Sequence, residues 1–430
     1  MTESTSEKIL GPDISREIFG GVLDYDGAGR YPGLELMNLV YCSDDSPLPS
    51  GEKVSVSRRG HDFARRLVWD KEFHDHPKKD DVLYDENSEL AIRHLLRCIQ
   101  LPIPSTSKTP GWDRAHFFPY TKSLIHWDAR IRGKNLQIQR RYLRGGGALA
   151  FRVLRMDKNT VRRDQIRDGF ESLYSGENTG PLETLASVLL GHGGADPTPL
   201  TDEIEAASRV LDDRYDELLR DGVANILNHL DLPTVARIRA LMNWVGFWLV
   251  VLQHSRASIS LDREPGVIIC DCGAGHAQLR RESQRCLARL QSLILEAVDE
   301  AAKGKDLKQK QRDKIRSFFW ATAATIGLLN SWRGRRHFTL GIEALEMHVL
   351  AATAPSTEIS FESFTTDWLF ERCGIVVGRE AAERSGLLMD FDASIFEENE
   401  SQLALQMQAA GLLSVYSDAT RMVGAGQERL

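Results

Sequence analysis

The feature that most constrains this fold is a helix-forming stretch that is apolar on every side. It begins after Pro233, a residue favoured in the first turn of a helix, and its centre is Ala240–Leu252. A helix that is apolar all round has to be buried. The apolar part is shorter than the ~20 residues that a membrane span needs, as is a second stretch at Phe318–Trp332, and arginines lie close to both. We therefore predict two buried core helices.

Length and composition indicate a folded protein of more than one domain. The chain has 430 residues, whereas a single domain usually has roughly 100–200. Its apolar fraction of 42% excludes a disordered chain. Six cysteines are too few for a disulfide framework, and the polar N-terminus has no apolar signal core. These observations predict a cytoplasmic protein that neither crosses nor binds a membrane.

We predict a mainly α fold with minor β structure (α+β), organised in three parts. Residues 1–170 form an irregular α/β region, broken by proline and glycine, with one clear helix at Glu86–Cys98. Residues 171–337 form a helical body, and residues 338–430 form a C-terminal module. In the body, apolar periodicity predicts a helix starting at the capping residue Thr201 and a long helix from about Ala277 to Ala302. The Lys-rich run Lys303–Lys314 is predicted to be a solvated connection.

The C-terminal module contains several short helices, then a last helix from about Asp392, and then two short strands. The segment from Gln408 to Val423 resembles the last helix and β-wing of winged-helix domains. We predict that its core consists of Phe361, Phe364, Trp368, Leu369, Phe396, Leu403, Met407 and Leu412. From Ser356 to the end the chain has thirteen acidic and five basic residues, and such a surface repels phosphates. The module is therefore expected to dock other protein subunits through Glu397, Glu398 and Glu400.

The most basic part of the chain is the segment from Arg130 to Arg167, which we call the basic stretch. It has twelve Lys or Arg residues against Asp157 and Asp164. Arginine binds phosphate, and interleaved aromatic side chains can stack on bases. Gly145–Gly147 would let the backbone approach a phosphate. The nucleic-acid-binding residues predicted here are Arg130, Arg132, Lys134, Arg140, Arg141, Arg144, Arg152 and Arg155. The alternatives are a solvated surface and an internal partner for the acidic module.

Two patterns suggest chemistry without completing a site. Residues 267–276 resemble the first motif of Rossmann-like methyltransferases, which would bind S-adenosylmethionine, but the second strand and its acidic residue do not follow. Cys270, Cys272, His276 and Cys286 are metal-ligand types, but their spacing does not match zinc sites. His61, His74 and His76 fall in a segment that reads as a charged surface loop. We therefore predict no catalytic residue, no metal and no cofactor.

The order of segments from Phe338 to Ala419 is similar to that of uncharacterised accessory proteins in multi-gene bacterial anti-phage clusters, including methylation-associated ones. That resemblance covers about ninety residues and implies a role in DNA-directed defence beside separate catalytic subunits. Combined with the basic stretch and the acidic module, it predicts a non-catalytic accessory or assembly subunit. Two alternatives stay open. One is an enzyme, either a degenerate methyltransferase or a metal-dependent nuclease, and the other is a regulatory scaffold that binds no nucleic acid.

Overall fold

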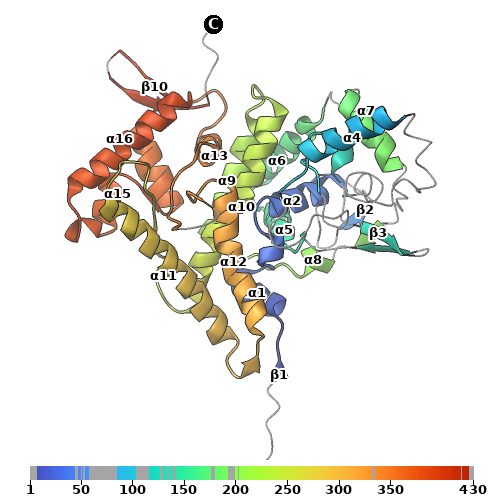
Figure 1. Ribbon diagram of the computed structural model, residues 1–430, viewed down its shortest axis with the longest axis horizontal. Coiled ribbons are helices and arrows are strands. Elements are labelled where there is room, and N and C mark those ends of the chain that lie inside the picture. Colours follow the sequence, from blue (N-terminus) through green and yellow to red (C-terminus); the bar gives the residue numbers. More distant parts are fainter. Residues whose placement is uncertain are drawn as a thin grey trace, which may run out of the picture.

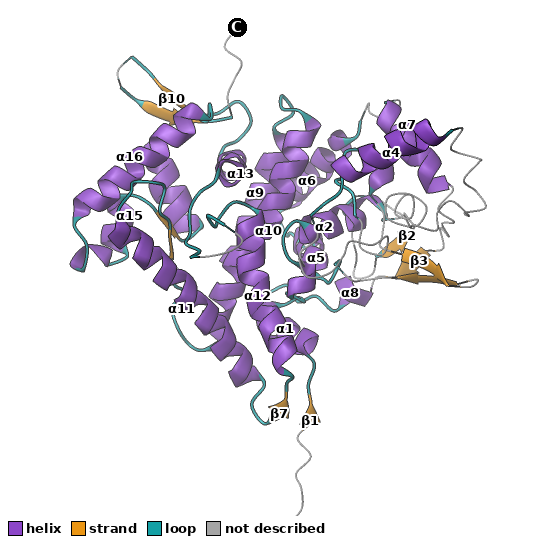
Figure 2. Cartoon of the chain, in the orientation of Figure 1, coloured by secondary structure: helices purple, strands orange, loops and turns teal. Residues whose placement is uncertain are grey.

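A computed structural model describes residues 7–43, 47–49, 51, 54–57, 85–102, 116–125, 129–132, 135–138, 142–175, 180–191, 199–201, 203–331, 335–417 and 419–425. The described chain is mainly helical with small sheets, as the sequence predicts (Figure 2). A single large hydrophobic core extends from Ile14 to Val423. All three predicted parts contribute to this core, which therefore does not separate them. The division into three domains stays a prediction.

Helix α10 (Thr234–Ser260) is the centre of the fold (Figure 1). It passes a test for a membrane span by length and composition, but 83% of its apolar window is buried inside the protein, as in the core helix that we predict. The indole N–H groups of Trp244 and Trp248 donate to backbone oxygens of the neighbouring helix α9, at 3.4 and 2.8 Å. The helices packed around α10 are α2 (Tyr31–Tyr41), α9 (Arg214–Asn228), α11 (Ala277–Ala301), α12 (Gln309–Thr325) and α13 (Ile342–Ala352).

Glycines allow two of these helices to approach α10 closely. A Cβ atom on Gly222 of α9 would lie 2.2 Å from the Trp244 ring, and one on Gly33 of α2 would lie 2.6 Å from the Met242 backbone. No side chain fits at such distances. The large Trp244 side chain is therefore accommodated by the absence of a side chain on the facing helix.

The N-terminal region contains more helix than predicted. Besides α4 (Glu86–Cys98), which is confirmed, it has the buried helices α1 (Gly11–Phe19) and α2. Pro32 lies in the first turn of α2, where its missing N–H costs no hydrogen bond, so the Tyr-Pro-Gly sequence starts a helix rather than breaking one. The remaining helical elements here are η1 (Tyr25–Gly27), η4 (Lys122–Leu124), α5 (Gly146–Arg155) and α6 (Thr160–Leu173), and the body begins with α7 (Pro181–Gly191) and α8 (Glu203–Ala206).

Three two-stranded pairs surround the body. Strand β1 (Glu7–Lys8) pairs in parallel with β7 (Lys305–Asp306). The antiparallel pairs are β2 (Ser55–Ser57) with β5 (Pro199–Thr201), and β3 (Ala129–Arg132) with β4 (Asn135–Ile138). Two predictions are corrected here. Thr201 ends strand β5 instead of capping a helix, and the run Lys303–Lys314 enters α12 at Gln309 instead of remaining a connection.

The C-terminal module has a small antiparallel sheet with the strand order β10–β11–β8. Leu413 faces Val423 across the hairpin, and Met422 faces Ser360. All eight side chains of its predicted core are buried. Its elements are β8 (Ile359–Ser360), α14 (Phe361–Ser363), the π-helix η5 (Phe364–Arg372), β9 (Ile375–Val376), α15 (Arg379–Arg384), η6 (Leu387–Met389), α16 (Ala393–Ala409), β10 (Leu413–Val415) and β11 (Arg421–Val423).

Two of the contacts that join this module to the body lie in the core. Strand β9 pairs in parallel with β6 (Ile268–Ile269), so that Ile375 lies beside Ile268. The Trp368 ring of η5 stacks on the Trp244 ring of α10, with centroids 5.7 Å apart and planes inclined by 20°. The side chains at both contacts are apolar and buried, so the module continues the core of the body.

Candidate functional site

The first part of the basic stretch lies on the β3–β4 hairpin, at the end of the molecule opposite the C-terminal module (Figure 2). Arg130 and Arg132 are on β3, where the backbone register pairs them with Gln137 and Asn135. The other basic residues predicted around this hairpin lie outside the described residues, and these are Lys134, Arg140 and Arg141.

The last three predicted nucleic-acid contacts are engaged inside the protein. Arg144 forms an ion pair with Asp24 at 2.5 Å, and the Arg152 guanidinium donates to the Glu205 backbone oxygen at 3.0 Å. Arg155 is buried, pairs with the Glu205 carboxylate at 2.9 Å, and donates to two backbone oxygens in the segment 49–51. Ionic and hydrogen bonds of this kind hold α5 to its neighbours.

The triple glycine does not form a phosphate site, and that prediction is wrong. The backbone N–H groups of Gly145 and Gly147 both donate to one carboxylate oxygen of Glu35, at 3.0 and 2.7 Å. Glu35 is buried on α2, so the chain supplies its own anion to the N-terminus of α5. The close fit of α5 on α2 explains the glycines, since a Cβ on Gly147 would lie 2.3 Å from the Pro32 oxygen.

The three acidic residues predicted to meet a partner differ in exposure. Glu397 pairs with Arg379 at 2.7 Å, and the Glu398 carboxylate lies 2.7 Å from the ring Nε2 of His276. Both of these carboxylates are at the surface. Glu400 is half-buried beside Gly378 and accepts from the Thr365 hydroxyl at 3.1 Å. Burial raises the pKa of Glu400, whose carboxylate is less exposed than those of Glu397 and Glu398.

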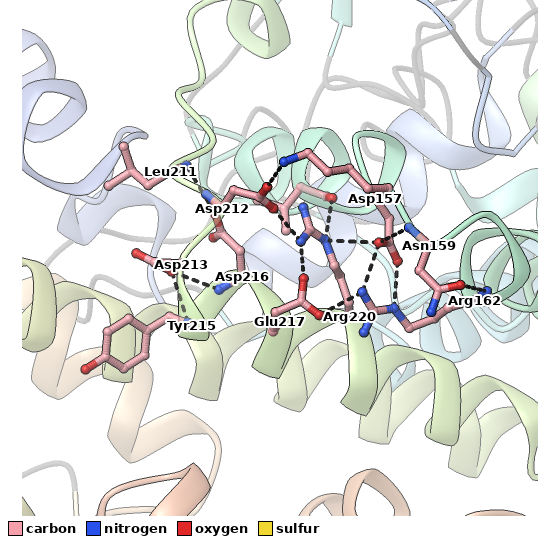
Figure 3. A network of polar contacts seen from close by, with 12 residues as sticks. Asp157, Asn159, Arg162, Leu211, Asp212, Asp213, Tyr215, Asp216, Glu217 and Arg220 are labelled. Atoms are coloured by element: carbon pink, nitrogen blue, oxygen red, sulfur yellow. Dashed lines mark hydrogen bonds and ion pairs between the residues drawn. The ribbon is translucent and has the colours of Figure 1, made fainter.

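A network of ion pairs between α6 and α9 was not predicted (Figure 3). Its centre is Arg220, a buried residue of α9 that pairs with Asp212 at 2.8 Å. Arg162 of α6 holds the two oxygens of Asp157 at 2.6 and 2.9 Å, and it also pairs with Glu217 at 2.8 Å. The sequence signal covers only one pair of this network, Glu217 three residues before Arg220.

Charge in this network is balanced by partners on neighbouring elements. Lys158 and then Arg220 lower the pKa of Asp212 to about 2. Burial alone would raise the pKa of Asp157, but hydrogen bonds from Arg162 and the Asn159 backbone outweigh burial and lower it. These carboxylates are therefore ionised and bonded at neutral pH, which suits fixing α6 to α9 rather than transferring protons.

The network ends at a groove between the body and the C-terminal module. Asp221 accepts from Arg162 at 2.6 Å and also pairs with Arg372 of η5, which links the two regions. The groove has a volume of about 620 Å³, and its lining includes Trp368, Gln165 and Asp367. Its charged groups come from α6, α9 and η5, so its shape depends on how the module sits on the body.

The glycine turn at residues 271–275 is held by one buried carboxylate. Gly273 and Gly275 have φ of 89° and 84°, which favour glycine. Asp271 accepts from the Gly273 N–H at 3.0 Å and pairs with Arg280 at 3.0 Å. Strand β6 before the turn pairs with β9 in a two-stranded sheet, and α11 after it runs on to Ala301. Asp271 thus fixes the turn, and this local sheet differs from the parallel sheet that binds dinucleotides.

The four residues of this segment that could bind a soft metal ion differ in burial. Cys270, Cys272 and Cys286 are buried free thiols, and burial raises the pKa of each one. His276 instead lies at the surface against Glu398. Among the residues that the structure describes, no group of three or more His, Cys, Asp or Glu side chains could hold a metal. His61, His74 and His76 are outside the described ranges.

Comparison of the chain with protein-family models, with curated proteins and with solved structures found no match.

Proposed function

We propose that this chain is a non-catalytic accessory or assembly subunit that joins a nucleic acid, or another acidic partner, to a second protein. The observation that carries the proposal is the separation of its two charged regions. The β3–β4 hairpin and the acidic module with α16 lie at opposite ends of the longest axis of the molecule (Figure 1). A chain built in this way can hold two partners at once without one blocking the other.

The hairpin end supports binding of an acidic ligand. Arg130 and Arg132 occupy a short two-stranded ribbon, and the sequence adds Lys134, Arg140 and Arg141 directly beside it. A cluster of five cations in twelve residues attracts phosphates without sequence preference and gives strongly salt-dependent binding. Acidic residues from elsewhere in the chain neutralise Arg144 and Arg155, but neither of these two arginines lies on the hairpin.

The opposite end supports docking to a protein. Its helices followed by a hairpin, with strand order β10–β11–β8, support the winged-helix-like assignment. The surface carboxylates Glu397 and Glu398 lie in the first half of α16, where they would repel a DNA backbone. We infer that this face recognises a protein surface with complementary positive charge, in a bacterial cytoplasmic complex. A DNA-directed anti-phage role is the context that the sequence resemblance implies for such a complex.

Salt-dependent binding tests this proposal directly. Full-length protein is titrated into fluorescent duplex DNA or single-stranded RNA over a series of salt concentrations. We expect the wild-type protein to bind with an affinity that falls as salt rises. Changing Arg130, Arg132, Arg140 and Arg141 to alanine should reduce the slope of log affinity against log salt concentration by about one unit for each arginine that contacts a phosphate. The charge-matched control replaces four lysines, all exposed and far along the chain, with alanine: Lys303, Lys305, Lys308 and Lys310.

Three outcomes are informative. A slope that falls in the arginine variant and not in the lysine control supports the hairpin as the binding surface. Equal losses in both variants would show that only net charge matters, and the hairpin would be rejected. If neither nucleic acid binds at low salt, the nucleic-acid half of the proposal fails.

A further inference from the structure

A second cavity lies where α9 and α10 meet the C-terminal module, and nothing in the proposed function uses it. Its volume is about 480 Å³, within the range of small-molecule sites. Arg214 and Tyr215 line it from the start of α9, and His254 and Ser255 line it from α10. The rest of its wall comes from the loop before β6, from the end of η5 and from Arg384 of α15.

Three buried side chains on this wall have polar atoms without a protein partner. Within the described part of the chain, no hydrogen bond reaches the Tyr215 hydroxyl, the Ser255 hydroxyl or either ring nitrogen of His254. The exposed fractions of these residues are 3%, 1% and 2%. Figure 3 shows the Tyr215 side chain pointing away from the ion-pair network beside it. An unsatisfied buried polar atom costs about 1–3 kcal/mol, so three such residues on one cavity indicate an absent bonding partner.

The charges around the cavity favour an anion as that partner. Arg384 is bonded to Glu371 at 2.5 Å, so these two charges cancel. The Arg214 guanidinium lies 4.8 Å from the Tyr215 ring centroid and has no ion pair with any residue in the described ranges. Burial, and then the charge of Arg214, lower the pKa of His254 to about 3. The imidazole is therefore neutral at physiological pH and can both donate and accept a hydrogen bond.

We propose that this cavity binds a small anionic metabolite, with a phosphate or carboxylate group at Arg214 and polar groups against Tyr215, His254 and Ser255. Aliphatic and aromatic surface from Val251 and Phe370 would cover the remainder of the ligand. Because the lining belongs to both the body and the C-terminal module, the bound molecule would bridge them. This site is independent of the nucleic-acid surface on the hairpin.

Thermal unfolding of the full-length protein tests the anion. The unfolding midpoint is measured against increasing sodium phosphate or sodium succinate, each compared with sodium chloride at the same ionic strength. We expect a saturable rise of the unfolding midpoint with at least one of these anions, and Arg214→Gln should remove that rise.

The control Arg263→Gln changes a nearby exposed arginine that pairs with Glu296, and this variant should retain the rise. A rise with phosphate alone assigns a phosphate group, and one with succinate alone assigns a carboxylate. No rise with either anion overturns the proposal, as does an equal rise in Arg214→Gln.

The buried hydroxyls provide a second test that does not depend on Arg214. Tyr215→Phe and Ser255→Ala each remove one unsatisfied group, so the midpoint without ligand should stay the same or rise. The apparent affinity for the effective anion should fall by roughly fivefold to tenfold, the value of one hydrogen bond. A lower midpoint without ligand would mean that the hydroxyls bond a buried water only, and would overturn the proposal. Nucleic-acid binding should be unchanged, so the two proposals fail separately.

Discussion

At the scale of single residues, the arginines of the basic stretch form two groups by the element on which they lie. Arg155 is enclosed by the protein and satisfied by Glu205 and by backbone oxygens, whereas Arg130 and Arg132 lie on a hairpin at the end of the molecule. Removing one partner of a buried ion pair is costly because the other charge stays buried and unpaired. The two groups should therefore respond differently to mutation.

We expect Arg155→Ala to lower the free energy of unfolding by about 3–5 kcal/mol, measured by urea denaturation. Adding Glu205→Gln should restore part of this loss, because the unpaired carboxylate is then removed. The control is Lys303→Ala, which breaks an exposed pair with Glu300 and should cost less than about 1 kcal/mol. Equal urea midpoints for Arg155→Ala and the unaltered protein would show that Arg155 contributes nothing to the fold.

The sequence could predict the charge of these residues but not their partners. The basic stretch counts twelve cations against two anions, yet Glu205, Asp24 and Glu35 come from other parts of the chain and neutralise it from inside. Such pairs join residues separated by 50 to 120 positions. Charge composition within a segment carries no information about contacts over that separation.

At the scale of elements, apolar periodicity predicted the long helices well. Helices α10, α11 and α16 lie close to their predicted positions because each one presents an apolar surface to the core. The sequence did not predict helix α2, because proline and glycine at positions 32 and 33 usually interrupt a helix. In the structure Pro32 lies in the first turn and Gly33 packs against Met242. The sequence groups Glu400 with its exposed neighbours Glu397 and Glu398. Its partial burial arises from the packing of α16 against Gly378, which the local sequence does not indicate.

The contact between η5 and α10 gives a prediction at this scale. Trp368→Ala should lower the free energy of unfolding by roughly 3–5 kcal/mol, because it removes a buried aromatic ring and leaves a cavity beside Trp244. The loss should be accompanied by faster hydrogen exchange in η5 and β9 than in α9 and α10, because the module loosens from the body. Mass spectrometry after exchange measures both regions in one experiment.

Met389→Ala is the control for this change, since Met389 is 90% exposed on the same module and should alter neither quantity. Uniform acceleration of exchange across the whole chain would instead indicate that the module and body unfold together. Such a result would contradict the expectation that the module loosens first.

At the scale of the whole molecule, the β3–β4 hairpin and the surface carboxylates of α16 lie too far apart to form ion pairs with each other (Figure 1). The acidic surface residues have their own neighbours, Arg379 for Glu397 and His276 for Glu398, within or beside the module. The hairpin is separated from them by the helical body around α10 (Figure 1). This arrangement does not support the alternative of an internal partner for the hairpin part of the basic stretch, whereas Arg162 near its other end lines the groove against the module.

Independence of the two ends can be measured without knowing the protein partner. Glu397→Lys with Glu398→Lys should leave the salt slope of nucleic-acid binding unchanged, because surface charges at that separation are screened. Combining this reversal with Arg130→Ala and Arg132→Ala should give the slope of the hairpin variant alone, since distant, independent sites add. Fluorescence anisotropy with the same labelled duplex provides all four slopes. If the reversal alone steepens the slope, nucleic acid also reaches the acidic end, and the chain is then a single continuous binding surface rather than a bridge between two partners.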